Sequence, residues 1–477
     1  MVVTQEETAL SRGRIPSHLR RQFQQILCMF LNVRGRRSRL NARLSLISPQ
    51  LLRLFLLYSR QKSTSRVLYS LFASFYYHYY SYDMFIRLTV LFNEQPMEDP
   101  VNELPPTEFY ELSGFWPGQF REIVDNLHLI PDRITCSVTR CAASKDTALF
   151  LMLRRWRKAD KWEDVSRVMR RGRVWCIKIY RELFSLLVQH YRRLVQVIDY
   201  RRIIPLLEEW SDSMVLYTGC CPDVLFFTDG KPWKMAKPGT GDAATALIRA
   251  AGGDEVNQVQ QAFYNGHYGF AGAKVQHVLQ ADGLCYSFTC PLRRHDAMVL
   301  QESSMLTMLS VLHVNNDPLR PVKCVSDKAY GRTRHLRPIH TTLELRLMAP
   351  HERAIAEEED SRNKGPRNAV EMSFNNIVRK FTHTDYFPNH RILQSGRSNW
   401  PYLRQLWDLQ VLFFNLFTCA EGMGNPINGM FGIAPPTVEE YLDSANRNML
   451  IPLVTARDED DNFREPQDDN RLYYHLP

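Results

Sequence analysis

Short apolar runs that end in polar residues recur through the middle of the chain and predict the strands of a sheet. The clearest begins at Val224, where four apolar residues precede Thr228, Asp229 and Gly230. This pattern is typical of a buried strand that stops at a polar edge. Asp282-Gly283 separates two further runs and is a strong hairpin signal. The predicted strands are 224–230, 272–282, 284–291, 323–326 and 336–340.

Apolar residues at helical spacing predict helices on both sides of these strands. Before the strands, the predicted helices are 108–113, 119–127, 145–158, 161–169 and 174–198. Between them, residues 295–312 predict a crossover helix. Residues 371–381 and 400–419 predict two later helices, and the second is apolar nearly all round, so we expect it to pack over the sheet. The acidic, polar stretch 357–366 predicts a loop before residue 371.

The order of these elements predicts an α/β fold with an RNase-H-like domain after an upstream all-α domain. The Pro-rich segment 93–106 predicts a linker, and the Gly/Ala-rich stretch 237–253 predicts an insert. We expect four regions: a basic, Leu- and Arg-rich extension without assigned chemistry (1–98), a helical domain (107–204), an α/β domain (215–420) and a peripheral C-terminal segment with an acidic, disordered tail (421–477).

Composition and charge narrow the class of partner. The 477-residue chain is 44% hydrophobic, so we expect most of it to fold. Its formal net charge of +9 is concentrated in residues 1–80 and 154–202. Such clusters favour a polyanionic partner, of which nucleic acid is the commonest, although a solvated helix face explains either cluster alone.

Cysteine usage and the apolar segments bear on the compartment. The ten cysteines are scattered and form no CxxC pair, which argues against a zinc site and indicates a reducing compartment. The N-terminus shows no secretory signal. Residues 67–92 are apolar enough to invite a membrane assignment, but Asp83 and Arg87 interrupt them, so a buried helix is favoured.

The end of the predicted helical domain has the order of a helix-turn-helix. A short helix (161–169) precedes the turn Arg170-Arg171-Gly172 and a long helix (174–198). If the second helix enters a DNA groove, the candidate contacts are Arg171, Arg173, Lys178 and Arg181. The pattern alone favours an ordinary helical bundle with solvated basic faces, because glycine turns between helices are common.

Three acids from separate elements form a candidate metal site. Asp229 ends the first predicted strand, Asp327 follows the 323–326 strand, and Glu371 opens the 371–381 helix. Mg²⁺ prefers a few carboxylates together with water and phosphate oxygens. Two such ions can activate a water and stabilise the leaving oxygen in phosphodiester cleavage. Each acid taken singly has an ordinary explanation, so the spacing by itself is a weak signal.

Six ordered blocks within residues 224–419 strengthen this interpretation, because together they resemble the catalytic domain of the PIF/Harbinger transposase-derived nucleases of the DDE superfamily. The blocks are Phe227-Thr-Asp-Gly230, Phe263-Tyr-Asn-Gly-His267, Lys274-Val-Gln-His-Val-Leu with Asp282-Gly283, Arg294-His-Asp-Ala-Met-Val-Leu-Gln-Glu-Ser303, Ser326-Asp-Lys-Ala-Tyr-Gly331 and Arg367-Asn-Ala-Val-Glu-Met-Ser-Phe374. One departure is Lys231-Pro-Trp, which stands where the family commonly has Thr.

The resemblance implies roles for individual residues. Asp229, Asp327 and Glu371 become the acidic triad that binds two Mg²⁺ ions, with Mn²⁺ as an alternative. Asp296 becomes an auxiliary metal or water ligand, a cap for its helix or a residue that supports the ligands, and we favour the last two. Arg367 becomes a phosphate contact or steers the helix that carries Glu371.

The resemblance also implies a function. It implies a metal-dependent DNA endonuclease and transposase that binds double-stranded DNA in the nucleus. We expect no membrane association, a monomer or homo-oligomer, and a Myb-like/SANT helper protein as partner. It favours the helix-turn-helix interpretation of residues 148–194, because family members carry a helical DNA-binding segment there. Two alternatives stay open: a domesticated, catalytically silent DNA-binding or partner-recruiting protein, and an RNase-H-like nuclease acting on RNA hybrids.

Overall fold

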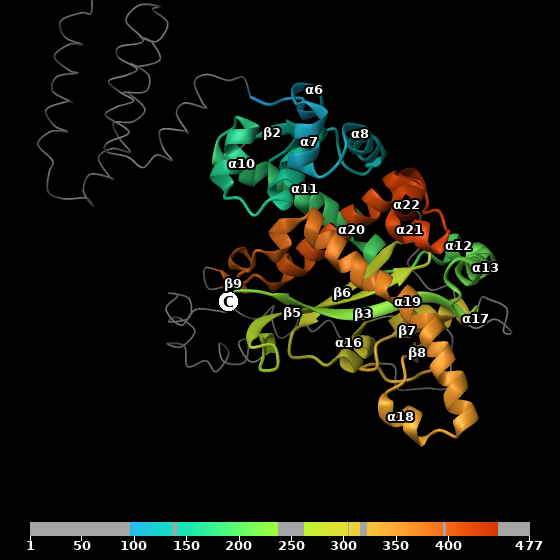
Figure 1. The fold of residues 1–477 in the computed structure, drawn as a ribbon. Coiled ribbons are helices and arrows are strands. Elements are labelled where there is room, and N and C mark those ends of the chain that lie inside the picture. The colour runs from blue at the N-terminus through green and yellow to red at the C-terminus, as the bar shows by residue number, and fades with distance from the viewer. Residues whose placement is uncertain are drawn as a thin grey trace, which may run out of the picture. The chain divides into compact units, whose positions relative to one another are not determined.

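A mixed sheet covered by helices forms the centre of the protein (Figure 1). The computed structural model describes residues 96–136, 141–236, 262–303, 305–314, 322–394 and 397–446, all in one compact unit, Glu94–Pro477. The basic extension up to residue 95, the membrane-like segment 67–92, the insert at 237–253 and the acidic tail lie outside the described residues. None of the described helices combines the length and the apolar character that crossing a bilayer requires.

The sheet has an antiparallel half and a parallel half. Strand β3 is its centre and pairs antiparallel with β5 and parallel with β7. Strand β6 continues the antiparallel half from β5, and β8 continues the parallel half from β7. The strands are β3 (Val224–Lys234), β4 (Tyr264–Asn265), β5 (Phe270–Gln280), β6 (Cys285–Pro291), β7 (Lys323–Ser326) and β8 (Leu336–Pro338). All five predicted strands are therefore confirmed, and β3 is longer than expected.

The predicted hairpin lies between β5 and β6. Gly283 adopts a φ of +80°, a left-handed conformation that favours glycine. The Asp282 side chain accepts a hydrogen bond from the Leu284 backbone N–H at 3.1 Å. The Asp282 carboxylate also forms an ion pair with Arg202 at 2.6 Å, and Asp282 is fully buried. The turn is thereby fixed both by its own backbone and by a residue of the helical part.

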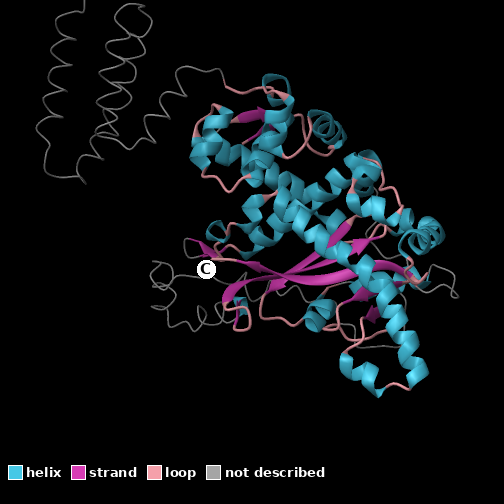
Figure 2. Cartoon of the chain, in the orientation of Figure 1, coloured by secondary structure: helices cyan, strands magenta, loops and turns pink. Residues whose placement is uncertain are grey.

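Helices surround the sheet and form most of the described chain before β3 (Figure 2). They are α6 (Pro100–Glu103), α7 (Pro106–Ser113), α8 (Pro117–Asn126), α9 (Lys145–Arg157), α10 (Trp162–Met169), α11 (Arg173–Tyr191), α12 (Tyr200–Ile203), α13 (Leu207–Thr218), α16 (Asp296–Glu302), α17 (Met305–Val314), α18 (Thr342–Leu347), α19 (Pro350–Lys380), α20 (Trp400–Glu421), α21 (Pro426–Phe431) and α22 (Val438–Asn446). Short two-stranded sheets join β1 (Arg133–Thr135) with β2 (Ala142–Ser144) and β9 (Leu393–Gln394) with β10 (Arg397–Ser398).

The long helix α19 corrects the prediction of a loop at 357–366. Its 31 residues run through Gly365 and Pro366 without a break. Tertiary contacts hold it just before the proline: the Arg362 side chain donates to the Gly219 carbonyl at 2.7 Å, and the Asn363 side chain accepts from the Cys221 N–H at 3.2 Å. The cost of the missing proline N–H is therefore offset by anchoring to the segment between α13 and β3.

Two other expected boundaries differ from the structure. The single crossover helix 295–312 is divided into α16 and α17, because Ser303 after α16 adopts extended backbone with ψ of 144°. The long helix predicted to end at 198 ends at Tyr191 and continues as a 3₁₀ turn, Arg192–Val195. The side chain of Arg192 binds the buried Asp408 of α20 at 2.7 Å, which fixes the chain at that point.

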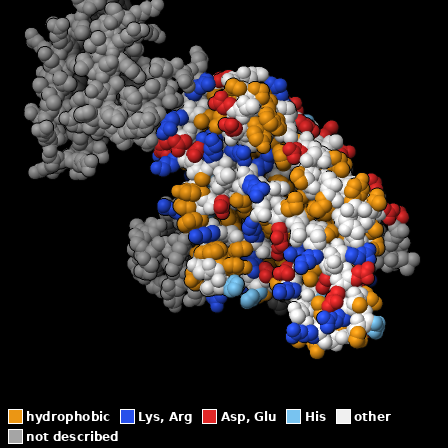
Figure 3. Space-filling view, in the orientation of Figure 1, with side chains coloured by type: hydrophobic (Ala, Val, Ile, Leu, Met, Phe, Trp, Pro, Cys, Tyr) orange, Lys and Arg blue, Asp and Glu red, His pale blue; other side chains and the backbone are white. Residues whose placement is uncertain are grey.

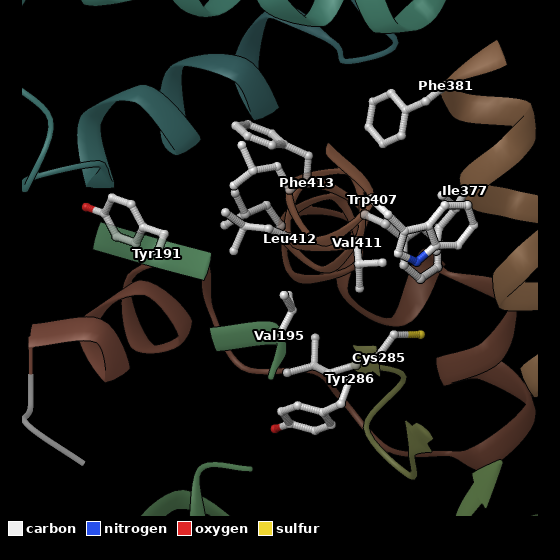
Figure 4. Close-up of a cluster of buried hydrophobic side chains, with 14 of the residues drawn as sticks. Tyr191, Val195, Cys285, Tyr286, Ile377, Phe381, Trp407, Val411, Leu412 and Phe413 are labelled. Carbon is white, nitrogen blue, oxygen red and sulfur yellow. The ribbon is translucent and has the colours of Figure 1, made fainter. Parts of the chain in front are cut away.

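One hydrophobic core joins the helical part to the sheet. Helix α20 lies in its centre, with Trp407, Val411, Leu412 and Phe413 directed at the surrounding elements (Figure 4). Trp156 of α9 packs edge-on against Phe413, with ring centroids 5.6 Å apart. The expected separate helical domain (107–204) is thus part of the same compact unit as the sheet.

The C-terminal segment is less peripheral than expected. Ile427 and Phe431 of α21 and Val438, Tyr441 and Leu442 of α22 are all buried in the core. Phe431 stacks on Phe227 of β3, with centroids 5.6 Å apart. Residues 426–446 therefore complete the cover of the sheet, and the interpretation of this part as peripheral is wrong.

Candidate active site

Asp229 and Asp327 follow paired positions on two parallel strands. Thr228 of β3 is in register with Ser326 of β7, and each aspartate is the next residue along its strand. The Asp229 carboxylate accepts a hydrogen bond from the Gly230 N–H at 2.8 Å, and the Asp327 carboxylate accepts one from the Lys328 N–H at the same distance. The parallel pairing therefore brings the first two acids to the same edge.

Helix α19 crosses β3 and β7 and brings Glu371 to this edge (Figure 1). Arg367, one helical turn earlier, lies between two of the acids. Its Nη2 is 3.0 Å from Glu371 Oε1, and its Nη1 is 3.6 Å from Asp229 Oδ2. The Arg367 side chain is 14% exposed and Asp229 is 23% exposed, whereas Glu371 is half exposed. One guanidinium thus bridges two of the three predicted ligands.

The environment of Asp229 disfavours its ionised form. Burial is the largest cause and raises its pKa to about 6, and the negative charges of Glu371 and Asp327 act in the same direction. The Gly230 N–H and Arg367 oppose this shift. A carboxylate that is buried beside two further acids gains from a nearby cation, which is the electrostatic condition of a metal site.

The three acids are near one another but are not arranged as a finished chelate. Within the described ranges, no group of three or more His, Cys, Asp or Glu side chains is close enough together to hold a metal ion as it stands. The donor set is all carboxylate oxygen, which suits Mg²⁺ or Mn²⁺. The residues fit such an ion in charge and chemistry, provided that Arg367 gives up its bridging position.

Asp296 lies beside this cluster but does not cap its helix. It is the first residue of α16, whereas His295 holds the N-cap position. The Asp296 carboxylate instead binds the Lys274 ammonium at 2.8 Å. A Cβ at Gly230 would lie 2.8 Å from Asp296 Oδ1 and 3.2 Å from the Tyr330 hydroxyl. The predicted cap is therefore wrong, and Gly230 is needed because both groups approach the strand closely.

Tyr330 and Lys274 are neighbours of the site that the sequence interpretation left without a role. Burial is the main cause that raises the pKa of Tyr330, and the charges of Asp296 and Asp229 add to it. The hydroxyl therefore stays protonated next to the acids. Tyr330 was visible as the residue three positions after Asp327, but nothing local indicated that its hydroxyl turns back toward β3.

A second group on the α19 side of β3 was also missed. His277 pairs with Asp229 across the β3–β5 ladder and stacks on Phe374, with centroids 3.9 Å apart. Burial, and then the charge of Lys231, lowers the pKa of His277 to about 3, so this ring is neutral. Lys231 donates to the Asn375 side chain at 2.9 Å and lies 5.8 Å from the Phe374 ring centroid.

Two helices joined by a turn lie where the helix-turn-helix was predicted. Helix α10 matches its predicted position, α11 ends at Tyr191 instead of residue 198, and Arg170 between them adopts a left-handed φ of 50°. Two of the proposed DNA contacts already have acidic partners: Arg171 pairs with Glu98, and Arg173 Nη1 lies 2.7 Å from Glu163 Oε1. The other two differ in exposure, since Arg181 is exposed and Lys178 is half-buried.

Comparison of the whole chain with protein-family models, curated proteins and solved structures found no match.

Proposed function

We propose that this protein is a metal-dependent DNA endonuclease and transposase of the Harbinger type, with Asp229, Asp327 and Glu371 as metal ligands. One observation carries the proposal: Asp327 and Glu371 lie close enough to Asp229 for their charges to raise its pKa. These acids lie far apart in the sequence, and a shared cation would explain why they converge.

The strand order supports an RNase-H-like sheet. Strand β3 lies in the middle, with β5 and β6 joined by antiparallel pairing on one side and β7 and β8 joined by parallel pairing on the other. This mixed sheet with flanking helices is compatible with the RNase-H-like domain that the order of the elements predicts. The six sequence blocks that resemble the Harbinger family agree with it.

Each residue has a defined task in this proposal. Asp229, Asp327 and Glu371 would hold divalent ions, which supply Lewis-acid activation of water and stabilisation of the leaving oxygen. Arg367 would release Asp229 and Glu371 and bind a phosphate oxygen, for which its planar guanidinium is suited. Asp296 would stay paired with Lys274 beside Gly230 and support the position of the first acid. The 3′-hydroxyl freed by hydrolysis would then attack target DNA.

Binding of double-stranded DNA is proposed to rest on the basic helical part, with Arg181 as its exposed contact and Lys178 beside it. Arg171 and Arg173 would bind phosphate only after breaking their ion pairs with Glu98 and Glu163. A nuclear location and a Myb-like/SANT helper protein follow from the family resemblance.

The proposal is tested by cleavage of supercoiled plasmid and of duplexes taken from the sequence that flanks the gene. We expect Asp229→Asn and Glu371→Gln to abolish cleavage with Mg²⁺ or Mn²⁺ and to retain DNA binding in EDTA. The matched control is Glu358→Gln, which changes an exposed acid on the same helix and should cleave normally. Full cleavage by Asp229→Asn would refute the assignment.

A second candidate is a domesticated DNA-binding protein that does not cut. The observation that favours it is the ion bridge of Arg367, which neutralises Asp229 and Glu371 without a metal. If the wild-type protein binds these duplexes but leaves them intact with both metals, this candidate replaces the first. Cleavage of an RNA–DNA hybrid in preference to duplex DNA would instead favour a nuclease acting on hybrids.

A further inference from the structure

A cluster of exposed aromatic side chains lies at the end of β3 beyond the candidate active site. Lys234 Nζ lies 4.4 Å from the Phe387 ring centroid and 5.8 Å from that of Phe270. Tyr268 is next to Phe270, with centroids 5.7 Å apart. Tyr268 and Phe387 are each 38% exposed, and Phe270 is half-buried. We call Tyr268, Phe270, Phe387 and Lys234 the aromatic platform.

The platform is built on fixed backbone. The turn before β5 is closed by the Gly269 N–H, which donates to the Asn265 carbonyl at 2.9 Å, and Gly269 adopts a φ of +70°. Phe387 begins a 3₁₀ turn whose carbonyl accepts from the His390 N–H at 3.0 Å. These rings are therefore presented to solvent by ordered turns, so their exposure is a property of the fold.

The platform and the candidate site lie on the same strand but on opposite faces of the sheet. Lys234 is five positions after Asp229, which corresponds to about 17 Å of strand, and successive side chains alternate between the two faces. Strand β7 ends at Ser326, opposite Thr228, so it does not extend beside this part of β3. Lys234 and Phe270 share the face that Gly230 presents to Asp296. Hydrophobic and basic side chains alternate over this end of the sheet (Figure 3).

This combination of groups identifies the ligand class. Aromatic faces stack on any nucleobase, and neighbouring lysines neutralise the phosphates between them, whereas paired bases have no free faces to offer. We propose that the aromatic platform binds unpaired nucleotides of a DNA strand at the end of β3. The choice of DNA as the strand rests on the proposed function.

The test measures binding of the full-length chain in EDTA, by fluorescence anisotropy, to a labelled single-stranded oligonucleotide and to the duplex of the same sequence. Losing one stacked base corresponds to a loss of about five- to 150-fold in affinity. We expect Phe387→Ala and Tyr268→Leu to weaken single-strand binding within this range and to change duplex binding less than about twofold. Tyr268→Phe keeps the aromatic face and should bind as the wild type does.

The control is Leu347→Ala, which removes a 79% exposed apolar side chain on α18, away from the platform. Circular dichroism confirms that each variant is folded. An equal loss of affinity for single strand and duplex would overturn the proposal that the aromatic platform binds unpaired nucleotides. Unchanged single-strand affinity in Phe387→Ala would overturn it too, and this is the result that a protein-docking surface would give. If the nuclease proposal is wrong, the result is different: the wild type shows no metal-dependent cleavage, but the variants still lose more affinity for single strand than for duplex.

Discussion

Replacing Asp229 by Asn should stabilise the metal-free protein at neutral pH. The pKa of Asp229 is raised from 3.8 to about 6 in the folded state, mainly by burial. A shift of about 2 units corresponds to at most about 3 kcal/mol at 1.36 kcal/mol per unit. Because the side chain is 23% exposed, solvent screens part of this term, and we expect a gain of about 1–3 kcal/mol. Asn can still accept the Gly230 hydrogen bond.

The pH dependence has a definite sign. The folded state binds the Asp229 proton more tightly than the unfolded state does, so this contribution to stability is fully present below about pH 4. It is lost as the pH rises toward about 6, and above that the ionised carboxylate destabilises the fold. The gain of Asp229→Asn should therefore be near zero at pH 4, grow between pH 4 and 6, and level off above it.

The assay is urea denaturation followed by tryptophan fluorescence in EDTA across this pH range. Arg367→Met is the companion variant, because it removes the cation that lowers the Asp229 pKa and should reduce stability above pH 6. Adding Mg²⁺ at 100 times its dissociation constant should stabilise the wild type by about 2.7 kcal/mol and Asp229→Asn by much less. A gain that does not change with pH, or a loss at pH 8, would refute the electrostatic reasoning.

Two further predictions concern stability. Gly230→Ala should lower the free energy of unfolding in urea by about 1–3 kcal/mol, because the added Cβ would lie 2.8 Å from Asp296 Oδ1. Gly331→Ala has open space around it and should be nearly neutral, so equal effects of the two substitutions would contradict the argument. Asp282→Asn should cost about 3–5 kcal/mol, because it leaves Arg202, whose side chain is 14% exposed, without its counter-charge. A loss below about 1 kcal/mol would show that water reaches the pair.

Local pattern was enough to predict the framework of the fold. The apolar runs predicted five of the six described strands of the central sheet, because a buried strand must be apolar whatever lies next to it. Asp282-Gly283 predicted the hairpin, since few other residues accept the backbone of that turn. The helix, glycine turn and helix at α10 and α11 were likewise visible.

Tertiary contacts decided the features that the sequence interpretation missed. Acidic and proline-containing residues around 357–366 look like a loop, but anchoring of Arg362 and Asn363 keeps α19 continuous through them. Asp296 looks like a cap, but Lys274 from a neighbouring strand binds its carboxylate. Residues 426–446 look peripheral, but their apolar side chains complete the core. In each case the partner lies far away in the sequence.

The candidate site likewise has some features that the sequence determined and others that only the tertiary structure decided. The sequence alone determined which residue types are present and on which elements, so Asp229, Asp327 and Glu371 could be named as candidates. Only the tertiary structure decided that Arg367 bridges two of them, that burial raises the pKa of the first, and that Lys234 lies against exposed aromatic rings at the end of the same strand. The reason is physical: side-chain type is a local property, whereas distance, burial and charge coupling depend on segments that meet only when the chain folds.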